Sequence, residues 1–542
     1  MKRASAWIVC LGFAIALCLE ARAGWIFLHG DLVDSDPPAH FATGVMLHDY
    51  LLSHHRAQPI SFARCFYLHY PKVALGHWPP LFYVFEALWF FAFGPTTRAA
   101  IWLGGAITAV YALALYRRVA ARVGPWFAVA AAAVLLALPV VQAQAWTVMS
   151  DVLLGVFVFL SLGSLSDYLT AGQRRDALMF AVWVSAAILT KATGWLLLAP
   201  VLLAPLLTGR RREYGKLTYW SAVAAILVIS APFYIWAGLA HLAYPLELKR
   251  RSLLLLADAS HLSVARGAAI ALCLVAAAWA IRYAWRREAL SRGSTEICVM
   301  AAWILTQAGL LAVTSATREL DRFYVPSIAP ALFILTLAMA VAQRRLAHRG
   351  FRYTALAPVA IYACVIIACV LIRPPLASTR AYSDALGSIP RLRDETILVE
   401  SDPDGEGAFV AASLEHDPSR SSYILRSTKL LSSSDWNRWS YSLTYRTEAE
   451  VSDALSALGV DYVIEDTSAP VRPDVPLLEA ALRDPAARWE VVGERRVAMG
   501  PRRGELITYR RGTVVRRSAP LAVKLGPEEA SQQLTCATDA LN

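Results

Sequence analysis

Long apolar runs recur along most of this chain, and no other feature limits its possible folds so strongly. A helix needs roughly 20 apolar residues to cross a bilayer. Hydrophobic residues make up 57% of the 542 residues and charged residues only 17%, a balance that excludes a soluble enzyme of this size. Runs of about the crossing length lie near residues 6–27, 98–116, 125–141, 150–169, 177–190, 193–208, 217–238, 265–284, 296–314, 324–342 and 354–373. We therefore predict a polytopic α-helical membrane protein with about 11 transmembrane helices.

Two places in this pattern leave alternatives open. The fifth and sixth runs are short and are separated by little more than "TKATG" (190–194), so they could form one bent hairpin or one long buried helix. The first run also resembles a cleavable signal peptide, with "MKR" at its start and "ARA" (21–23) at its end. Cleavage would not change the side of the membrane on which the later loops lie.

Positive charges in the short loops predict the orientation, because cytoplasmic loops retain Lys and Arg. Alternate loops, beginning at Tyr116, Gly172, Gly209, Arg282 and Gln343, together hold 17 of these residues, whereas the other short loops hold about 6. We therefore expect a cytoplasmic N-terminus, with residues 28–97 and everything after about Arg373 on the outer side. Compact loops and an Ala- and Arg-rich composition favour the inner membrane of a bacterium.

The formal net charge of +11 does not indicate a nucleic-acid partner. Most of the excess lies in membrane-flanking loops, where it orients helices and meets anionic lipid. No nucleic-acid-binding motif occurs, so we expect membrane lipids and no nucleic acid as partners. The eight cysteines show no paired spacing, so no disulfide framework is expected, although Cys65 and Cys536 both fall on the outer side and could pair.

Composition changes near residue 375 to that of an ordinary soluble domain. Strands are predicted at 396–401, 422–426, 461–466, 489–494 and 505–511, and helices at 404–417 and 447–460. The second helix has Thr447 and Glu450 in a capping-box arrangement. Residues 376–542 are thus predicted to form an extracytoplasmic soluble α/β domain. It has no Gly-rich phosphate loop and no obvious nucleophile, so a binding or covering role is expected.

The densest acidic cluster of the chain follows the first apolar run, in "GDLVDSDPPAHFATG" (30–44). A carboxylate there could accept a proton from a hydroxyl, or bind a divalent cation that neutralises phosphate. Asp34 and Asp36 are therefore candidates for a general base. They could instead cap the helix expected to begin near Pro37, because proline is favoured in the first turn of a helix and aspartate just before it.

Two helices predicted in the same outer loop would form a roof over this cluster. Apolar residues share one side of residues 40–55, and "HWPPL" (77–81) precedes a second apolar helix. Both are expected to lie in the membrane interface. The cavity beneath them, at the level of the lipid headgroups, would contain the acidic cluster.

Three further polar residues are expected on the same side of the membrane. Asp151 begins the fourth run, where an acid is costly without a partner or a task, although Asp151 or Ser150 could simply cap the helix. Lys191 lies at the outer end of two runs, where it could snorkel to the interface. His77 could be a metal ligand or a turn residue.

Cations also occur at the outer entrance of the tenth run, against the positive-inside trend. Arg318 and Arg322 are followed there by Tyr324, and "LKRRS" (248–252) adds three more outer cations. A phosphate would explain them, because Arg binds phosphate in bidentate fashion.

The motifs of residues 1–375 resemble, in their order and sidedness, the membrane glycosyltransferases of the GT-C superfamily. The nearest families are the dolichyl-phosphate-mannose protein mannosyltransferase-like proteins and the bacterial aminoarabinose lipid A transferases. The motifs are the acidic cluster, "HWPPL", the acid that begins the fourth run, the "TK" step at 190–191 and "RELDRFYVPSIAP" (318–330).

The resemblance implies a reaction and roles for particular residues. A carboxylate in the first outer loop activates the acceptor hydroxyl, and a polyprenyl phosphate carries the donor sugar. The family often has a second acid after this carboxylate and then His or Tyr, whereas here Pro37 follows Asp36, and His40 stands four residues after Asp36. Asp36 is therefore the first choice for the base and Asp34 the second, with His40 in the substrate site.

The remaining candidates match other parts of the family pattern. Asp151 would orient the acceptor or a metal ion, and His77 would belong to the substrate-binding element. Lys191, Arg318 and Arg322 would hold the lipid phosphate, with Tyr324 beside them. A divalent metal ion is compatible with an Asp and a His at one site but is not required.

The expected function is transfer of a sugar, with inversion, from a polyprenyl phosphate to an acceptor hydroxyl on an envelope lipid, glycan or protein. One alternative is a lipid-linked oligosaccharide ligase or polymerase, which would transfer a whole glycan at a similar site. The other is a polytopic transporter or flippase, which would place charges at mid-membrane and break helices in related halves. Consumption of a single-sugar polyprenyl phosphate would distinguish the expected function from both alternatives.

Overall fold

The computed structural model describes two compact units. The described residues are 30–53, 58–73, 76–239, 278, 281–282, 292–313, 322–348, 364, 380–390, 392–433, 441–485, 488–499 and 502–512. The helical unit comprises residues 76–82 and the described part of 102–374. The α/β unit comprises the described parts of 24–75, 83–101 and 375–542.

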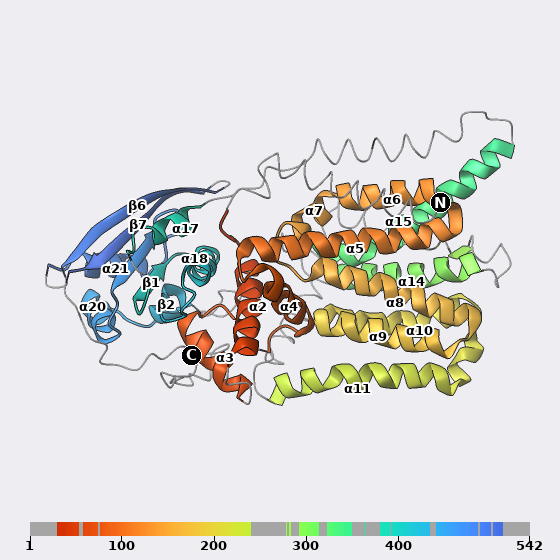
Figure 1. The fold of residues 1–542 in the computed structure, drawn as a ribbon, viewed down its shortest axis with the longest axis horizontal. Coiled ribbons are helices and arrows are strands. Elements are labelled where there is room, and N and C mark those ends of the chain that lie inside the picture. The colour runs from red at the N-terminus through yellow and green to blue at the C-terminus, as the bar shows by residue number, and fades with distance from the viewer. Residues whose placement is uncertain are drawn as a thin grey trace. The chain divides into compact units, whose positions relative to one another are not determined.

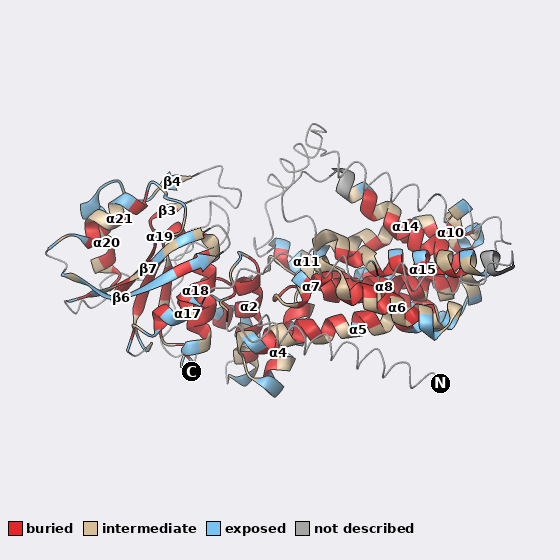
Figure 2. Ribbon diagram, turned by 90° about the horizontal axis from the view of Figure 1, so that it is seen from above, coloured by how far each residue is buried: buried red, intermediate tan, exposed pale blue. Residues whose placement is uncertain are grey.

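The helical unit consists of apolar helices that lie side by side around α8 (Figure 1). Its elements are α5 (Thr97–Val123, whose first five residues belong to the α/β unit), α6 (Pro125–Ala137), α7 (Pro139–Ala145), α8 (Asp151–Ala171), α9 (Arg174–Thr190), η1 (Ala192–Leu197), α10 (Leu198–Leu207), η2 (Arg211–Gly215), α11 (Leu217–Leu239), α14 (Arg292–Val313) and α15 (Val325–His348). Helix α8 packs against α9, α14 and α15 and is buried along most of its length (Figure 2). A Cβ at Gly155 of α8 would lie 3.1 Å from the Tyr111 ring of α5, so this small residue leaves room for the ring against α8.

By length and composition, four described helices could cross a membrane: Thr97–Val123, Asp151–Ala171, Leu217–Gly238 and Arg322–Arg344. The pair α6 and α7, bent by 66°, could make a fifth. Three predicted runs, 6–27, 265–284 and 354–373, lie wholly or almost wholly outside the described residues. The apolar helical fold is therefore confirmed, and the count of 11 stays a prediction.

The fifth and sixth runs form a hairpin and not one long helix. Helix α9 ends at Thr190, and Lys191 has an extended backbone before η1 begins. A Cβ at Gly194 would lie 2.6 Å from the backbone of Ala187, so η1 folds back closely against α9. Of the two alternatives left open above, the bent hairpin is the one observed.

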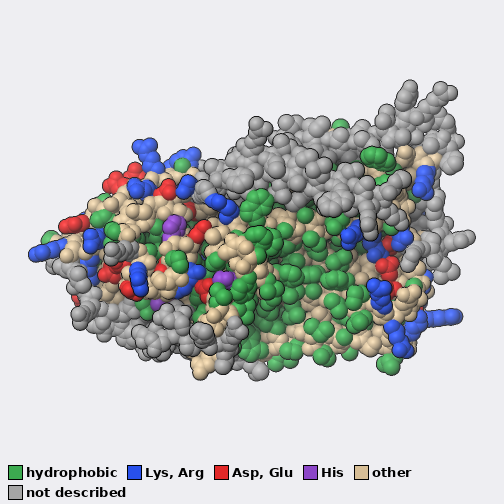
Figure 3. Space-filling view, in the orientation of Figure 1, with side chains coloured by type: hydrophobic (Ala, Val, Ile, Leu, Met, Phe, Trp, Pro, Cys, Tyr) green, Lys and Arg blue, Asp and Glu red, His purple; other side chains and the backbone are tan. Residues whose placement is uncertain are grey.

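Charged side chains gather at one end of the helical unit, beyond a broad apolar face (Figure 3). In this unit the fully buried Glu296 of α14 forms ion pairs with Arg118 (2.7 Å) and Arg122 of α5. Arg118 also pairs with Asp167 of α8 at 3.1 Å. Arg118 and Arg122, which the sequence predicts to lie in a cytoplasmic loop, therefore also join α5 to α8 and α14.

The α/β unit contains a five-stranded mixed sheet with the order β2–β1–β5–β7–β6 (Figure 1). Its strands are β1 (Thr396–Glu400), β2 (Tyr423–Arg426), β5 (Tyr462–Asp466), β6 (Trp489–Met499) and β7 (Arg502–Arg511), and a separate pair consists of β3 (Ser432–Ser433) and β4 (Ser442–Leu443). Its helices after residue 375 are α17 (Ala381–Leu386), α18 (Pro403–His416), α19 (Ser427–Leu430), α20 (Glu448–Ala457) and α21 (Val475–Leu482). Strands β2, β1 and β5 are parallel, and β7 and β6 are antiparallel. Every residue of β1 and β5 is buried, as expected for central parallel strands.

All five strands and both helices predicted after residue 375 are present. The capping box is also confirmed, because the Thr447 side chain accepts a hydrogen bond from the Glu450 backbone N–H at the start of α20. The Glu450 carboxylate accepts one in return from the Arg446 backbone N–H at 2.6 Å. Local sequence signals were therefore sufficient for this sheet region.

The helices of the first loop belong mostly to the α/β unit. They are α2 (Pro37–Leu52), α3 (Pro59–His69) and α4 (Leu81–Phe93), of which α2 packs on α18 and α3 on β2. Residues 37–45 are all buried, so the prediction of an amphipathic interfacial helix is corrected for the first half of α2. Its aromatic and small side chains are covered by protein on all sides. This compact unit thus extends beyond the predicted segment 376–542.

Helix α4 has the two-sided character that α2 lacks. Phe82, Tyr83, Glu86, Ala87 and Phe90 are buried. The opposite side exposes only apolar residues among its large side chains: Val84, Phe85, Leu88, Phe91 and Phe93. An interfacial position for α4 stays a prediction, and this distribution fits it.

One cysteine of the first loop is paired. Cys65 lies buried in α3 and is disulfide-bonded. At least one disulfide therefore exists in a chain whose cysteine spacing predicted no framework. Disulfides persist in oxidising compartments, which is relevant to the side of the membrane on which α3 lies.

Candidate active site

The aspartates of residues 30–36 differ in their surroundings. Asp31 accepts hydrogen bonds from the backbone N–H groups of Tyr382 (3.0 Å) and Ser383 (3.1 Å) at the start of α17. Aspartate oxygens stabilise a helix start in this way. Asp31 therefore caps a helix that begins about 350 residues later in the chain, and its role is structural.

Asp36 is buried at the N-cap position of α2, but its side chain makes no capping hydrogen bond. The Ser35 hydroxyl donates to it at 3.3 Å. The capping alternative is thus wrong for Asp36. Asp34 is exposed and accepts a hydrogen bond from the Ser35 backbone N–H, with a φ of 138° that is unfavourable for a residue other than glycine.

A buried polar row extends from Asp36 along the contact between α2 and α4. His40 lies one turn after Asp36, and its Nδ1 is 2.9 Å from the Tyr83 hydroxyl. Glu86 lies one turn beyond Tyr83 and is fully buried, and neither of its oxygens has a hydrogen-bond partner among the described residues. Burial raises the pKa of Glu86 well above its usual range, because a low-dielectric environment disfavours the charged carboxylate.

Glycine at position 44 is what permits this arrangement. A Cβ at Gly44 would lie 2.2 Å from Oε2 of Glu86, a distance that no side chain could tolerate without displacing the carboxyl group. The Glu86 side chain therefore occupies the space that the glycine leaves open on α2.

Asp151 and Lys191 form a pair in the helical unit. Lys191 Nζ lies 2.6 Å from Oδ1 of Asp151, and the two side chains are 16% and 1% exposed. Ser150 makes no side-chain capping bond to α8, and Oδ2 of Asp151 has no hydrogen-bond partner among the described residues. The partner that a buried acid requires is thus Lys191, and Lys191 is held by Asp151 in place of snorkelling freely.

Arg322 lies close to this pair through a shared aromatic ring. Lys191 Nζ is 5.2 Å from the centre of the Phe323 ring, and the Arg322 guanidinium is 5.7 Å from it. Both distances are in the range of cation–π attraction. Two cations therefore approach one aromatic ring, and one of them, Lys191, is paired with Asp151.

The remaining candidates of this group are Tyr324, Arg318 and His77. Tyr324 follows Phe323 at the start of the span Arg322–Arg344, and Arg318 lies outside the described residues. His77 is in a turn, with its ring 5.2 Å from that of Trp78. In the described part of the chain, no three His, Cys, Asp or Glu side chains come together as a metal site.

The candidates thus form two groups in different units. Asp34, Asp36 and His40 lie in the α/β unit, whereas His77, Asp151, Lys191, Arg322 and Tyr324 lie in the helical unit. Phe323, Tyr83, Glu86 and the buried Lys72 were not predicted. The positive charge of Lys72 could have identified it, because a cation in the predicted outer loop runs against the positive-inside trend. The aromatic residues and Glu86 do not have this signal.

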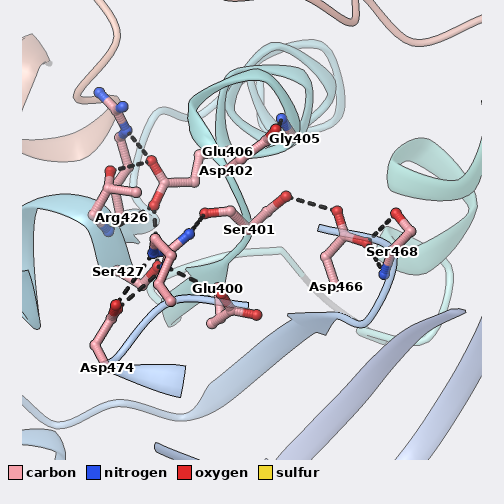
Figure 4. A network of polar contacts seen from close by, with 12 residues as sticks. Glu400, Ser401, Asp402, Gly405, Glu406, Arg426, Ser427, Asp466, Ser468 and Asp474 are labelled. Carbon is pink, nitrogen blue, oxygen red and sulfur yellow. Dashed lines mark hydrogen bonds and ion pairs between the residues drawn. The ribbon is translucent and has the colours of Figure 1, made fainter. Parts of the chain in front are cut away.

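In the described part of the α/β unit, side chains of the chain itself occupy the carboxyl ends of the parallel strands, where α/β sheets often bind ligands. Polar groups of the chain fill this edge and satisfy one another (Figure 4). Arg472 donates to Glu400 (3.0 Å) and Ser427 (2.7 Å), and the fully buried Glu406 accepts from Arg426 at 2.7 Å. These contacts indicate a structural network.

Comparison with known proteins agrees with the fold and with the family resemblance. The family model described as dolichyl-phosphate-mannose-protein mannosyltransferase matches residues 77–236. No curated protein matches the sequence. The structure is similar to ArnT from Cupriavidus metallidurans bound to undecaprenyl phosphate, with a TM-score of 0.58 and 13% identity over 94% of this chain and 99% of that chain.

A second similar structure is the archaeal oligosaccharyltransferase AglB from Archaeoglobus fulgidus, in complex with an inhibitory peptide and a dolichol-phosphate. The TM-score is 0.50 and the identity 13%, over 85% of this chain and 69% of that chain. The chain therefore has the GT-C fold and resembles the protein mannosyltransferases and ArnT.

Proposed function

We propose that this GT-C protein is an inverting glycosyltransferase of the bacterial inner membrane. It transfers a sugar from a polyprenyl phosphate to an acceptor hydroxyl on an envelope lipid, glycan or protein at the extracytoplasmic face. Residues 1–375 carry the catalytic residues, part of which belong to the same compact unit as the extracytoplasmic domain of residues 376–542.

The observation that carries this proposal is the approach of Lys191 and Arg322 to one aromatic ring beside a single buried carboxylate. Lys and Arg side chains that approach one another at the end of an apolar span suit the binding of a phosphate. A lipid phosphate supplies both this anion and an apolar tail. The phosphate leaves the anomeric carbon as an anion, so these cations also stabilise the charge that develops in the transition state.

Asp36 is the proposed base. It is buried, and it makes no capping hydrogen bond to α2. Its carboxylate takes the proton of the acceptor hydroxyl as that oxygen bonds to the anomeric carbon. The bond between this carbon and the phosphate oxygen breaks on the opposite face, and the configuration inverts. A single base without a covalent intermediate distinguishes this reaction from that of the retaining glycosidases.

The disulfide of Cys65 supports the proposed sidedness. Such bonds are rare in the reducing cytoplasm, so α3 and the unit around it fit the outer side. The base and the C-terminal sheet belong to this same unit.

The direct test is consumption of the donor by purified protein. Undecaprenyl phosphate carrying one radiolabelled sugar should be converted to free undecaprenyl phosphate when an envelope extract supplies acceptors. An untouched single-sugar pool, with consumption of an oligosaccharide-linked carrier, would favour the ligase or polymerase alternative, for which the likeness to AglB is the supporting observation. Movement of the donor between leaflets without a change in its chemistry would favour a flippase.

Replacing Arg322 is expected to weaken donor binding. Arg322→Ala removes one of the two cations on the Phe323 ring and should raise the dissociation constant for undecaprenyl phosphate about 10- to 100-fold, the range for a charge-assisted hydrogen bond. Calorimetry in detergent measures this dissociation constant. Arg344→Ala, at the far end of the same span and exposed, is the matched control and should bind normally. Equal affinity of both variants would remove Arg322 from the phosphate site.

A further inference from the structure

Lys72 is a buried cation of the α/β unit that has no part in the reaction described above. Its ammonium group donates a hydrogen bond to the carbonyl oxygen of Pro403, in the first turn of α18, at 3.0 Å. A Cβ at Gly407 of α18 would lie 2.9 Å from Cε of Lys72 and 3.2 Å from Cγ of Pro38. The Lys72 side chain therefore passes through a narrow gap between the start of α2 and the start of α18.

The charges around Lys72 include the proposed base. Burial lowers the pKa of Lys72 to about 7, nearby Arg426 lowers it as well, and the carboxylates of Glu406, Asp404 and Asp36 raise it. Glu406 has its own cationic partner, Arg426, at 2.7 Å. Asp404 likewise lies 3.5 Å from Arg502.

We propose that Lys72 is a positioning residue that keeps Asp36 ionised below neutral pH, and that α18 sets its place through the Pro403 carbonyl and the gap over Gly407. A nearby cation favours the charged form of a carboxylic acid. Asp36 must be ionised to accept a proton, so this inference rests on the proposed function. Above about pH 7 Lys72 loses its charge, but a carboxylate needs little help to stay ionised there.

Each element that packs around Lys72 and Asp36 carries further ionisable groups. They are Asp34 before α2, His40 on α2, Tyr83 and Glu86 on α4, Asp402, Asp404 and Glu406 at α18, Arg426 on β2 and Arg502 on β7. Burial raises the pKa of both Tyr83 and Glu86, which disfavours a negative charge on either group.

The test is the pH dependence of sugar transfer by full-length Lys72→Met protein. Without the cation, the acid limb of the rate profile should move up by about one pH unit, so the rate on that limb falls about tenfold while the rate above about pH 8 is unchanged. Lys429→Met, which removes a cation from α19 of the same unit, is the matched control and should keep the wild-type profile. A uniform loss at every pH would indicate a merely structural role and overturn the proposal, as would an unchanged profile.

Gly407→Ala provides a second variant that keeps the charge. Its methyl group would displace the Lys72 side chain, and the acid limb should move in the same direction by a smaller amount. A wild-type profile in this variant would overturn the role of α18. Asp36→Asn separates the two proposals: full activity in that variant refutes the proposed base, whereas loss of activity together with a normal Lys72→Met profile refutes only the inference about Lys72.

Discussion

Sugar transfer by Asp36→Asn protein is expected to fall about a thousandfold, within the usual contribution of a positioned general base. Asparagine keeps the shape of the side chain but cannot take the proton of the acceptor hydroxyl. Because Asp36 makes no capping hydrogen bond to α2, the substitution should leave the helix start intact. Single-turnover kinetics with a labelled donor measure the chemical step, and calorimetry with undecaprenyl phosphate should show unchanged donor binding.

Asp34→Asn is the matched control for this experiment. Asp34 is exposed and bonds to the adjacent backbone, so its variant should keep most of the activity. Normal turnover by Asp36→Asn would transfer the role of base to Asp34 or Asp151. A loss of donor binding in Asp36→Asn would instead make Asp36 a binding residue.

The second large effect is expected on stability. Lys191→Met leaves the carboxylate of Asp151, whose side chain is 1% exposed, buried without its cation. Breaking a buried pair from one side typically costs about 3 to 5 kcal/mol, so the variant should lose a comparable free energy of unfolding. Thermal unfolding in detergent micelles measures this loss. Asp151→Asn should cost less, because Lys191 is partly exposed and can reach solvent.

The double variant Asp151→Asn/Lys191→Met distinguishes structure from function at this pair. It removes both charges together, so most of the stability should return. Donor affinity should stay low, because the cation that meets the phosphate is still missing. Recovery of donor affinity along with stability would show that Lys191 acts only as the partner of Asp151.

The first loop and the C-terminal sheet pack together in one unit. Tyr70 donates a hydrogen bond to Asp417 at 2.7 Å, and the His69 and Tyr423 rings stack at 3.9 Å. These contacts join segments that are far apart in the sequence: Tyr70 and Asp417 are separated by 347 residues. The proposed base on α2 therefore depends on the C-terminal region for its surroundings.

Secondary structure could be predicted where the signal is local. Apolar runs of crossing length predicted the long helices, and short apolar segments bounded by turns predicted β1 and β5. The Thr447 cap needed only residues within one turn of it. The burial of α2 was missed because its apolar side resembles that of an interfacial helix, and contacts with α3, α4 and α18 cover the rest.

The sequence by itself determined that the chain is a membrane protein with a C-terminal sheet region, and which carboxylates and cations are candidates for a site. Hydropathy, periodicity and caps depend on neighbouring residues, so they are readable without a structure. Tertiary structure decided that Asp151 pairs with Lys191, that Asp31 caps α17 while Asp36 makes no capping hydrogen bond to α2, and that Lys72 is buried against α18. An ion pair or a distant cap depends on which segments packing brings together, and that information is not local in the sequence.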